Sequence, residues 1–412
     1  MTKEGAKAKH KRRLAWISVL VLLASGCSKA VPQLALSLYA GYSHNIPPCN
    51  GSHCQTIVPR NGPKLRAVFV SIGGIAVDSK TGDLYVVDHT ASQLKVVRAS
   101  GMVQTIAGSP YEGKCVRRDG LGASARFCGP VGVAFDSVRR TLYVADYANS
   151  AVRRVTLSGL VTTLVETPAH REQFTIIQPC ALRPAKLPTL CGPTGIAVDP
   201  VSGAVFVSDS ADMVIVKISP TGRVDSLAGM PGSCGYADGR GSSARFCFPE
   251  GLAFDAQAGA LLVADTNNNR IRQVDLTGRV STVAGMSYPS GPSEGVTDIG
   301  NGECRDFNGI ESFLALCGPY GVAHDADTGA IYIADTLNSE IRKMWRGRSS
   351  TIAGHYVWLG GFSWGSGHWC YPKPPYDQHS ICAPLSIALD PVRRRLYFAD
   401  GVSGQVWRLD GL

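Results

Sequence analysis

The N-terminus of the sequence lacks an apolar run long enough to span a membrane. The run from Leu14 to Gly26 has 13 residues, whereas a transmembrane helix needs about 20. Six lysines and arginines lie before it, and the small residues Ala24 and Gly26 lie at its end. Such a basic stretch followed by a short apolar core is typical of a signal peptide. We therefore expect residues 1–26 to direct export and residues 27–412 to form the mature protein.

Cys27 follows this run directly. The segment from Leu23 to Cys27 resembles a bacterial lipobox, although Ala24 stands where leucine is favoured. Two outcomes stay open: lipidation at Cys27, or cleavage without an anchor. In both, we expect an extracytoplasmic protein, secreted or on the cell surface. It would meet a membrane only through the signal segment or a lipid on Cys27.

Charge is also scarce. Charged residues make up 18% of the chain and hydrophobic residues 44%, a balance that excludes a disordered polypeptide. The formal net charge is +9, but the first 26 residues hold six of the 41 bases and one of the 32 acids, which leaves about +4. Nucleic-acid-binding domains show a much stronger basic bias. We therefore expect no nucleic-acid partner.

The sequence has no Cys-x-x-Cys pair and no His/Cys cluster at metal-ligand spacing, which argues against a structural zinc site. It has 13 cysteines, and all but Cys27 fall into local couples. An even set of cysteines in an exported chain is typical of disulfides. The expected pairs are Cys49/Cys54, Cys115/Cys128, Cys180/Cys191, Cys234/Cys247, Cys304/Cys317 and Cys370/Cys382.

An internal repeat accounts for most of the chain. The phrase Gly-Ile-Ala-Val-Asp at 74–78 is followed by Leu-Tyr-Val-Val-Asp at 84–88, and this pair recurs at 132–146, 195–209, 251–265, 321–335 and 386–400. The two aspartates are ten residues apart in all six copies. Each pair predicts a β-hairpin, and two further strand-like runs follow it. Four strands per unit, repeated in this way, predict the blades of a β-propeller.

The sixth unit lacks its fourth strand. After Asp400 the chain supplies one run, around Val406, and then ends. The missing strand phrase occurs near the mature N-terminus, at 34–40. We therefore expect this strand to complete blade six and close the ring, which removes open sheet edges.

These motifs resemble the NHL repeat family over nearly all of 33–412. Blade four carries the fullest match, from Tyr236 through Ala244-Arg245-Phe246 to Asn267-Asn268-Asn269-Arg270. The resemblance implies an all-β, six-bladed propeller of four-stranded antiparallel blades. The expected blades are 74–108, 132–166, 195–229, 251–285, 321–354, and 386–412 together with 33–41. The pattern is broken at Val165-Glu166, where the blade 132–166 ends, and blade six has Ser386 in place of the first glycine.

All variation in length lies in the connections between blades, and the cysteine couples lie there too. Strand alternation places these connections on one face. The loop 355–385 is unusually aromatic, and we select Trp358, Phe362, Trp364, Trp369 and Tyr371 as binding candidates because exposed aromatics favour protein or carbohydrate contacts. The alternative is a small core under a long loop. Asn50, in Asn-Gly-Ser, is a glycosylation candidate in a eukaryotic secretory route.

The channel mouth should be lined by the residue before each first strand. These are Gly73, Val131, Thr194, Glu250, Tyr320 and Leu385. In the amidating lyases, propellers of the same family type, histidines near these positions hold zinc, but here none is histidine and only Glu250 is acidic. We name Glu250 and Tyr320 as binding candidates, assign no catalytic residue and no metal ligand, and leave calcium in the channel as an alternative.

Two Gly-x-Ser-x-Gly segments, at 291–295 and 361–365, lie in Gly/Pro-rich loops without the strand-to-helix elbow that esterases need. The sequence therefore predicts an exported scaffold that binds a protein or a glycan through its disulfide-bonded loops. The rival hypothesis is a metal-dependent hydrolase or lyase with its site in the central channel.

Overall fold

The computed structural model describes residues 34–41, 59–110, 116–167, 190–285, 316–354, 381–401 and 403–412. Residues Leu34–Leu412 form one compact unit, separate from Met1–Gln33. Among the described residues, no helix is both long enough and apolar enough to cross a membrane.

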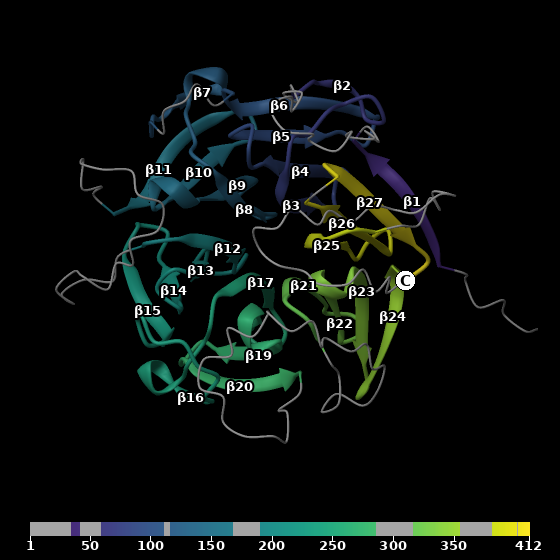
Figure 1. Cartoon of the computed structure of the whole chain (residues 1–412). Helices are drawn as coiled ribbons and strands as arrows, with labels where there is room; N and C mark the ends of the chain where they lie inside the picture. The colour runs from purple at the N-terminus through teal and green to yellow at the C-terminus, as the bar shows by residue number, and fades with distance from the viewer. Residues whose placement is uncertain are drawn as a thin grey trace, which may run out of the picture. The chain divides into compact units, whose positions relative to one another are not determined.

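The unit is a six-bladed β-propeller, as the repeat predicts, and Figure 1 shows the blades following one another around a central axis. Each blade is an antiparallel sheet. Blade one contains β3 (Ile72–Asp78), β4 (Asp83–Asp88), β5 (Gln93–Val97) and β6 (Met102–Gly108); blade two contains β8 (Pro130–Asp136), β9 (Thr141–Asp146), β10 (Ala151–Thr156) and β11 (Leu160–Glu166). Blade three contains β12 (Pro193–Val198), β13 (Val205–Asp209), β14 (Val214–Ile218) and β15 (Val224–Gly229).

The remaining blades follow the same order. Blade four contains β17 (Pro249–Asp255), β18 (Ala260–Asp265), β19 (Arg270–Asp275) and β20 (Arg279–Ala284). Blade five contains β21 (Pro319–Asp325), β22 (Ala330–Asp335), β23 (Glu340–Trp345) and β24 (Arg348–Gly354). Blade six contains β25 (Pro384–Asp390), β26 (Arg395–Asp400), β27 (Gln405–Asp410) and the N-terminal β1 (Ala35–Ala40).

Three blades have a fifth strand that the repeat does not predict. The short strands β2 (Gly62–Pro63), β7 (Gly120–Leu121) and β16 (Gly239–Arg240) pair with the outer strands of blades one, two and four. A one-turn 3-10 helix follows two of them, η1 (Gly122–Ser124) and η4 (Gly241–Ser243). Two-residue strands are too short to give an alternating pattern, so propensity alone cannot reveal them. The other 3-10 turns, η2 (Tyr147–Asn149), η5 (Thr266–Asn268) and η8 (Thr336–Asn338), join the second and third strands of their blades.

Strand β1 closes the ring as expected. It pairs antiparallel with β27, from Ala35 opposite Asp410 to Ala40 opposite Val406, and Figure 1 shows the purple β1 beside the yellow β27. Tyr39 is buried and contacts Tyr397 edge to face, with ring centroids 4.9 Å apart. The two ends of the described chain are thereby held in one sheet.

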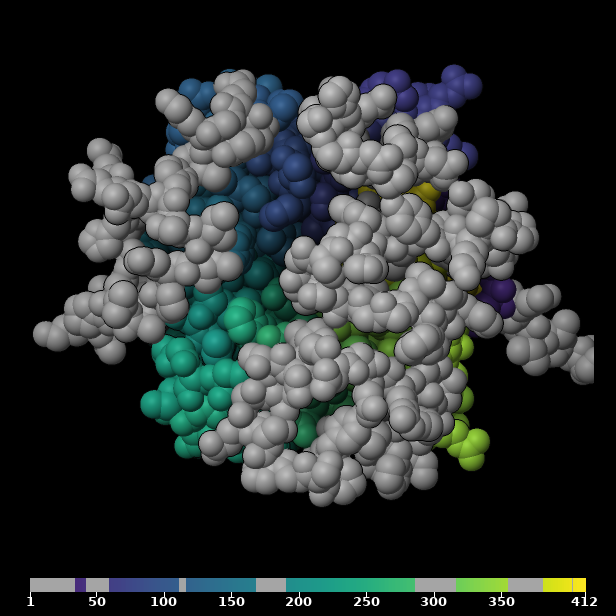
Figure 2. Space-filling model, in the orientation of Figure 1, coloured from purple at the N-terminus to yellow at the C-terminus, as the bar shows by residue number. Residues whose placement is uncertain are grey.

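The hydrophobic core lies between blades rather than within them. Six clusters of buried apolar side chains occupy the six junctions between neighbouring blades of the described ring. At the junction of blades three and four, for example, the rings of Phe206 and Phe254 stack with centroids 5.6 Å apart. In the space-filling view, the blue, teal and green residues of blades one to four follow one another in contact around the ring (Figure 2). A blade alone would leave both faces in water, so the blades stabilise one another by stacking.

The first-strand glycine of the repeat is required by this stacking. A Cβ atom at Gly195 would overlap the backbone carbonyl oxygen of Glu250 in the next blade, and one at Gly251 would overlap that of Tyr320. The inner strands thus pack backbone to backbone around the channel. Blade six has Ser386 at this position, and its hydroxyl accepts a hydrogen bond from the N–H of Ile75 in blade one at 3.1 Å.

Candidate functional site

The aspartate that ends each second strand holds the connection that enters the same blade. Asp146, Asp265 and Asp335 each accept a hydrogen bond at 2.7–2.8 Å from the backbone N–H of Cys128, Cys247 and Cys317, respectively. The corresponding contacts in blades three and six are Asp209 with Cys191 and Asp400 with Cys382. These aspartates thus cap backbone amides of the connections. The contacts also place the C-terminal ends of the inter-blade connections beside the turns between second and third strands. We call the face that carries these connections and turns the loop face.

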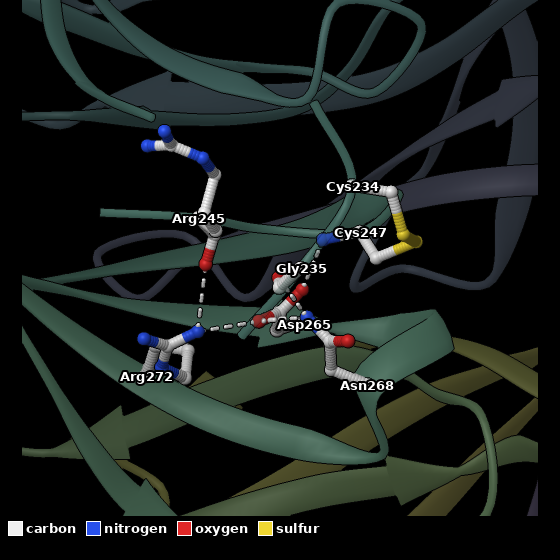
Figure 3. Close-up of a disulfide and its surroundings, with 7 residues drawn as sticks. All are labelled: Cys234, Gly235, Arg245, Cys247, Asp265, Asn268 and Arg272. Carbon is white, nitrogen blue, oxygen red and sulfur yellow. Dashed lines mark hydrogen bonds and ion pairs between the residues drawn. A yellow bond between two sulfur atoms is a disulfide. The ribbon is translucent and has the colours of Figure 1, made fainter. Parts of the chain in front are cut away.

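Two of these aspartates also bind a buried arginine that sequence reasoning missed. The guanidinium of Arg272 donates to Asp265 at 2.7 Å (Figure 3). It also donates to Asp238, in the connection, at 2.6 Å. Arg153 joins Asp146 and Asp119 in the same way, at 2.8 and 2.7 Å. Both arginines have no exposed side-chain surface. Each arginine therefore joins an aspartate of the connection to an aspartate of the blade through buried ion pairs.

A basic residue seven positions after the strand-end aspartate was the available sequence signal. It occurs in four blades as Lys95, Arg153, Arg272 and Arg342, whereas blades three and six have Val216 and Trp407 there. The signal is visible only when the blades are aligned on the aspartate.

The connection between blades three and four is described in full. The structure forms the predicted Cys234–Cys247 disulfide (Figure 3). Three large apolar side chains of this connection are exposed: Met230 at 43%, Tyr236 at 48% and Phe248 at 41%. The guanidinium of Arg270 lies 4.1 Å from the ring centroid of Tyr236. The disulfide-bonded connection thus presents apolar and aromatic groups to solvent on the loop face.

Phe248 also has an unusual backbone conformation. Its φ is +51°, in the left-handed region, and the equivalent positions Gly129 and Gly318 have φ of +52° and +53°. Glycine adopts this conformation freely, whereas a bulky residue is strained there by about 1–2 kcal/mol. Strained residues cluster at binding and catalytic sites. Phe248 therefore combines an exposed aromatic side chain with a left-handed backbone on the loop face.

The central channel has the lining that the sequence predicted. Gly73, Val131, Thr194, Glu250, Tyr320 and Leu385 all line a cavity of about 70 Å³ where the six first strands meet. The polar side chains of Thr194, Glu250 and Tyr320 come from neighbouring blades, three to five. The candidates Glu250 and Tyr320 are brought together there, and their side chains hydrogen-bond.

Glu250 is the one carboxyl group among the residues that line this cavity. Burial raises the pKa of Glu250 to about 8, opposed by hydrogen bonds from Thr194, Tyr320 and Ser210. The charge of Glu250 in turn raises the pKa of Tyr320. The carboxyl group of Glu250 is thus largely protonated at neutral pH.

A second acidic group lies in blade three. Ligand atoms of Cys191, Asp209 and Asp212 lie within 4.8 Å of one another. Cys191 is disulfide-bonded, so its sulfur is not a thiolate ligand. Burial raises the pKa of Asp209 to about 7, and the charge of Asp212 adds to the rise. Asp209 already accepts hydrogen bonds from the N–H groups of Cys191 and Gly192, which gives it a structural role.

Several predicted site residues lie outside the described residues. These are Cys27, Asn50, the aromatic set Trp358, Phe362, Trp364, Trp369 and Tyr371, and the cysteines Cys49, Cys54, Cys115, Cys180, Cys304 and Cys370. Cys128, Cys191, Cys317 and Cys382 are disulfide-bonded. The assignments outside the described residues stay predictions.

Comparison with known proteins agrees with this architecture. The family model of the Teneurin NHL domain matches residues 109–345, more than half of the chain. The chain belongs to this family. It is 28% identical to Teneurin-m of Drosophila melanogaster over 309 residues, which cover 68% of this chain and 11% of that protein. It is 25% identical to human NHL repeat-containing protein 2 over 294 residues, 66% of this chain and 38% of that protein. The chain thus spans about a tenth of the length of the teneurins.

Solved structures share the fold at low identity. An auxiliary nutrient binding protein from Bacteroides thetaiotaomicron superposes with a TM-score of 0.58 and 12% identity, over 92% of this chain and 76% of that one. A streptogramin B lyase superposes with a TM-score of 0.50 and 12% identity, over 92% and 97% of the two chains. One fold thus supports both binding proteins and lyases, so function has to be argued from the residues of this chain.

Proposed function

We propose that this NHL propeller is an extracytoplasmic scaffold that binds a protein partner through its loop face. Phe248 carries the proposal. It is an exposed aromatic held in a strained conformation at a position where blades two and five have glycine with the same φ, and it lies on a connection closed by a disulfide. A binding function explains why such a residue is retained.

The neighbours of Phe248 suit a protein interface. Tyr, Met and Arg are enriched at such interfaces, and Tyr and Arg carry much of their binding energy. Tyr236, Met230 and Arg270 supply these side chains on the same connection and the adjacent strand. The buried Arg272 and the disulfide hold the connection in place, which lowers the entropy lost on binding.

The direction of β1 supports the loop face as the binding surface. Ala35, at the start of β1, pairs with Asp410 at the end of β27. That end lies on the opposite face, formed by the turns between first and second strands and between third and fourth strands; we call it the hairpin face. A tether that precedes Leu34 is therefore attached at the hairpin face and leaves the loop face open to a partner.

Export is part of the proposal. It is supported by the basic and apolar pattern of residues 1–26 and by the Cys234–Cys247 disulfide, since disulfides persist mainly outside the cytoplasm. A lipid at Cys27 and sugar at Asn50 belong to it as further predictions, as does a contribution from Trp358 and Trp364.

Affinity capture with matched variants tests the proposal. The purified protein is used as bait on native cell surfaces, followed by mass spectrometry. We compare the wild type with Tyr236→Ala/Phe248→Ala on the loop face and Val138→Ala/Val201→Ala on the hairpin face, where both valines are exposed. A protein captured by the wild type and the hairpin-face variant but lost with the loop-face variant supports the proposal. Capture of glycans alone contradicts it, as does stoichiometric metal with hydrolase activity.

A further inference from the structure

Three polar side chains line the central cavity from neighbouring blades: Thr194, Glu250 and Tyr320, in blades three, four and five. Ser386 of blade six and apolar side chains such as Val131 and Leu385 line it as well. Glu250 follows the exposed Phe248 by two residues but is itself buried.

Glu250 has spare hydrogen-bonding capacity in this cavity. The residue is 7% exposed, and its Oε2 atom has no hydrogen-bond partner among the described residues. A buried acceptor without a partner is costly and therefore uncommon in folded proteins. Thr194 and Ser210 hydrogen-bond to each other at 2.5 Å, and Ser210 also donates to the carbonyl oxygen of Pro249. When Glu250 is ionised, its Oε2 atom can therefore accept a hydrogen bond from a donor that enters from the channel.

We propose that the cavity binds a primary alkylammonium group, with Glu250 as its counter-ion. An ammonium group offers three hydrogen-bond donors and one positive charge. One donor fits Oε2 of Glu250, and the hydroxyl oxygens of Thr194 and Tyr320 lie close enough to Glu250 to serve as further acceptors. The apolar side chains of Val131 and Leu385, which also line the cavity, suit the methylene stem of such a group.

Metal ions fit these residues less well. Calcium takes six to eight oxygen ligands, usually from several carboxylates, whereas the described lining supplies one carboxyl group. Zinc prefers histidine and cysteine, and the described lining contains neither. A cavity of about 70 Å³ has room for a few water-sized groups, which suits the head of an alkyl chain.

Two sources share this chemistry: a small free amine and the side chain of a lysine on a protein. Calorimetric titration of the full-length protein with n-butylammonium and with Nα-acetyl-lysine amide separates them. Binding of both indicates that a lysine side chain reaches the site, whereas binding of butylammonium alone indicates a free amine. Either result supports the proposal.

The variant Glu250→Gln keeps the shape of the side chain and removes its charge. It should weaken butylammonium binding about 10- to 100-fold, the usual effect of losing a charge-assisted hydrogen bond. Asp225→Asn is the matched control, because it removes one negative charge from an exposed ion pair with Arg223, outside the cavity. It should leave the affinity unchanged. Near-ultraviolet circular dichroism checks that both variants are folded.

Protonation gives an independent readout. Because Glu250 is largely protonated at pH 7, binding of a cation should release close to one proton, seen as a dependence of the binding enthalpy on the buffer. Affinity should rise about tenfold from pH 6 to pH 7, about fivefold from pH 7 to pH 8, and level off above pH 8. Tyr320 and Tyr147 are the titratable groups that face Glu250, and both stay neutral in this range because their pKa values are raised.

Three outcomes would overturn the proposal. They are no ammonium binding at millimolar concentration, equal binding by Glu250→Gln, and stoichiometric calcium binding that excludes butylammonium. None of these bears on the loop face, so the two proposals fail independently.

Discussion

The hydroxyl oxygen of Ser386 lies 3.1 Å from the backbone nitrogen of Ile75, although 311 positions separate them in the sequence. The contact joins blade six to blade one at the inner strands. The guanidinium of Arg393 joins the same two blades at the hairpin face, where it donates to the carbonyl oxygen of Ser79 at 2.7 Å. The ring is therefore closed by β1 and by direct contacts between its first and last blades.

The first prediction concerns the inner strands. Gly195→Ala should destabilise the protein by about 1–3 kcal/mol, because the new Cβ overlaps the carbonyl oxygen of Glu250 and must push blades apart. Ser386→Ala, which loses one hydrogen bond and adds no atom, should cost about 1 kcal/mol or less. Denaturant unfolding measures both. Equal losses would show that backbone packing around the channel is not tight.

The second prediction concerns ring closure. Deletion of residues 30–42 should lower Tm by at least about 10 °C, because it removes buried Tyr39 and Ala40 and exposes the edge of β27. Removal of residues 1–26 alone is the control and should leave Tm unchanged. An unchanged melt after the longer deletion would show that β1 is not needed for closure.

The third prediction concerns the buried arginines. Arg272→Met should destabilise the protein by about 3–5 kcal/mol, because it leaves Asp265 buried without its cation. Arg223→Met is the matched control; that arginine is 76% exposed in its pair with Asp225 and should contribute less than about 1 kcal/mol. A small effect of the first substitution would mean that Asp265 is protonated in the folded state.

The fourth prediction separates stability from binding. Phe248→Gly should stabilise the fold by about 1 kcal/mol, because glycine adopts a φ of +51° without strain. Phe248→Ala keeps the Cβ atom and should give no such gain. Both variants should lose partner binding. A loss of stability in Phe248→Gly would show that packing of the Phe248 phenyl ring stabilises the folded protein.

The fifth prediction concerns pH. The folded-state pKa of Glu250, about 8, lies above its unfolded value, so its contribution to stability is complete at low pH and is lost as pH rises toward 8. Glu250→Gln should reduce the loss of stability between pH 5 and pH 8 by up to about 1.4 kcal/mol per pH unit. Some slope should remain, because burial also raises the pKa of Asp209 and Asp335 to about 7. An unaltered slope would mean that Glu250 is ionised across this range.

The sequence predicted most of the fold because each repeat carries the pattern of one four-stranded blade. Two aspartates ten residues apart mark each hairpin, and the glycine before them marks the packing of inner strands. The channel residues Thr194, Glu250 and Tyr320 followed from their place directly before the glycine of each repeat phrase. In the structure each is the second residue of its first strand. Ring closure followed from one missing strand and one surplus strand.

The remaining features depend on contacts that no local pattern encodes. The short strands β7 and β16 form because Asp119 and Asp238 are held by buried arginines more than 30 positions away. The strain at Phe248 appears only when its φ is compared with those of Gly129 and Gly318. Glycine follows Cys128, Cys191 and Cys317 in the sequence, and comparing these positions with Phe248 would have revealed the missing glycine.

Position-resolved crosslinking tests the use of the loop face most directly. A photo-crosslinking amino acid is placed singly at Phe248 or Tyr236 on the loop face, and at Val138 or Val201 on the hairpin face, in the full-length protein on native cells. All four side chains are more than 40% exposed, so accessibility alone does not distinguish them. The account predicts one recurrent protein crosslinked from the loop-face positions and absent from the hairpin-face positions. Equal crosslinking from both faces, or from the hairpin face alone, would contradict it.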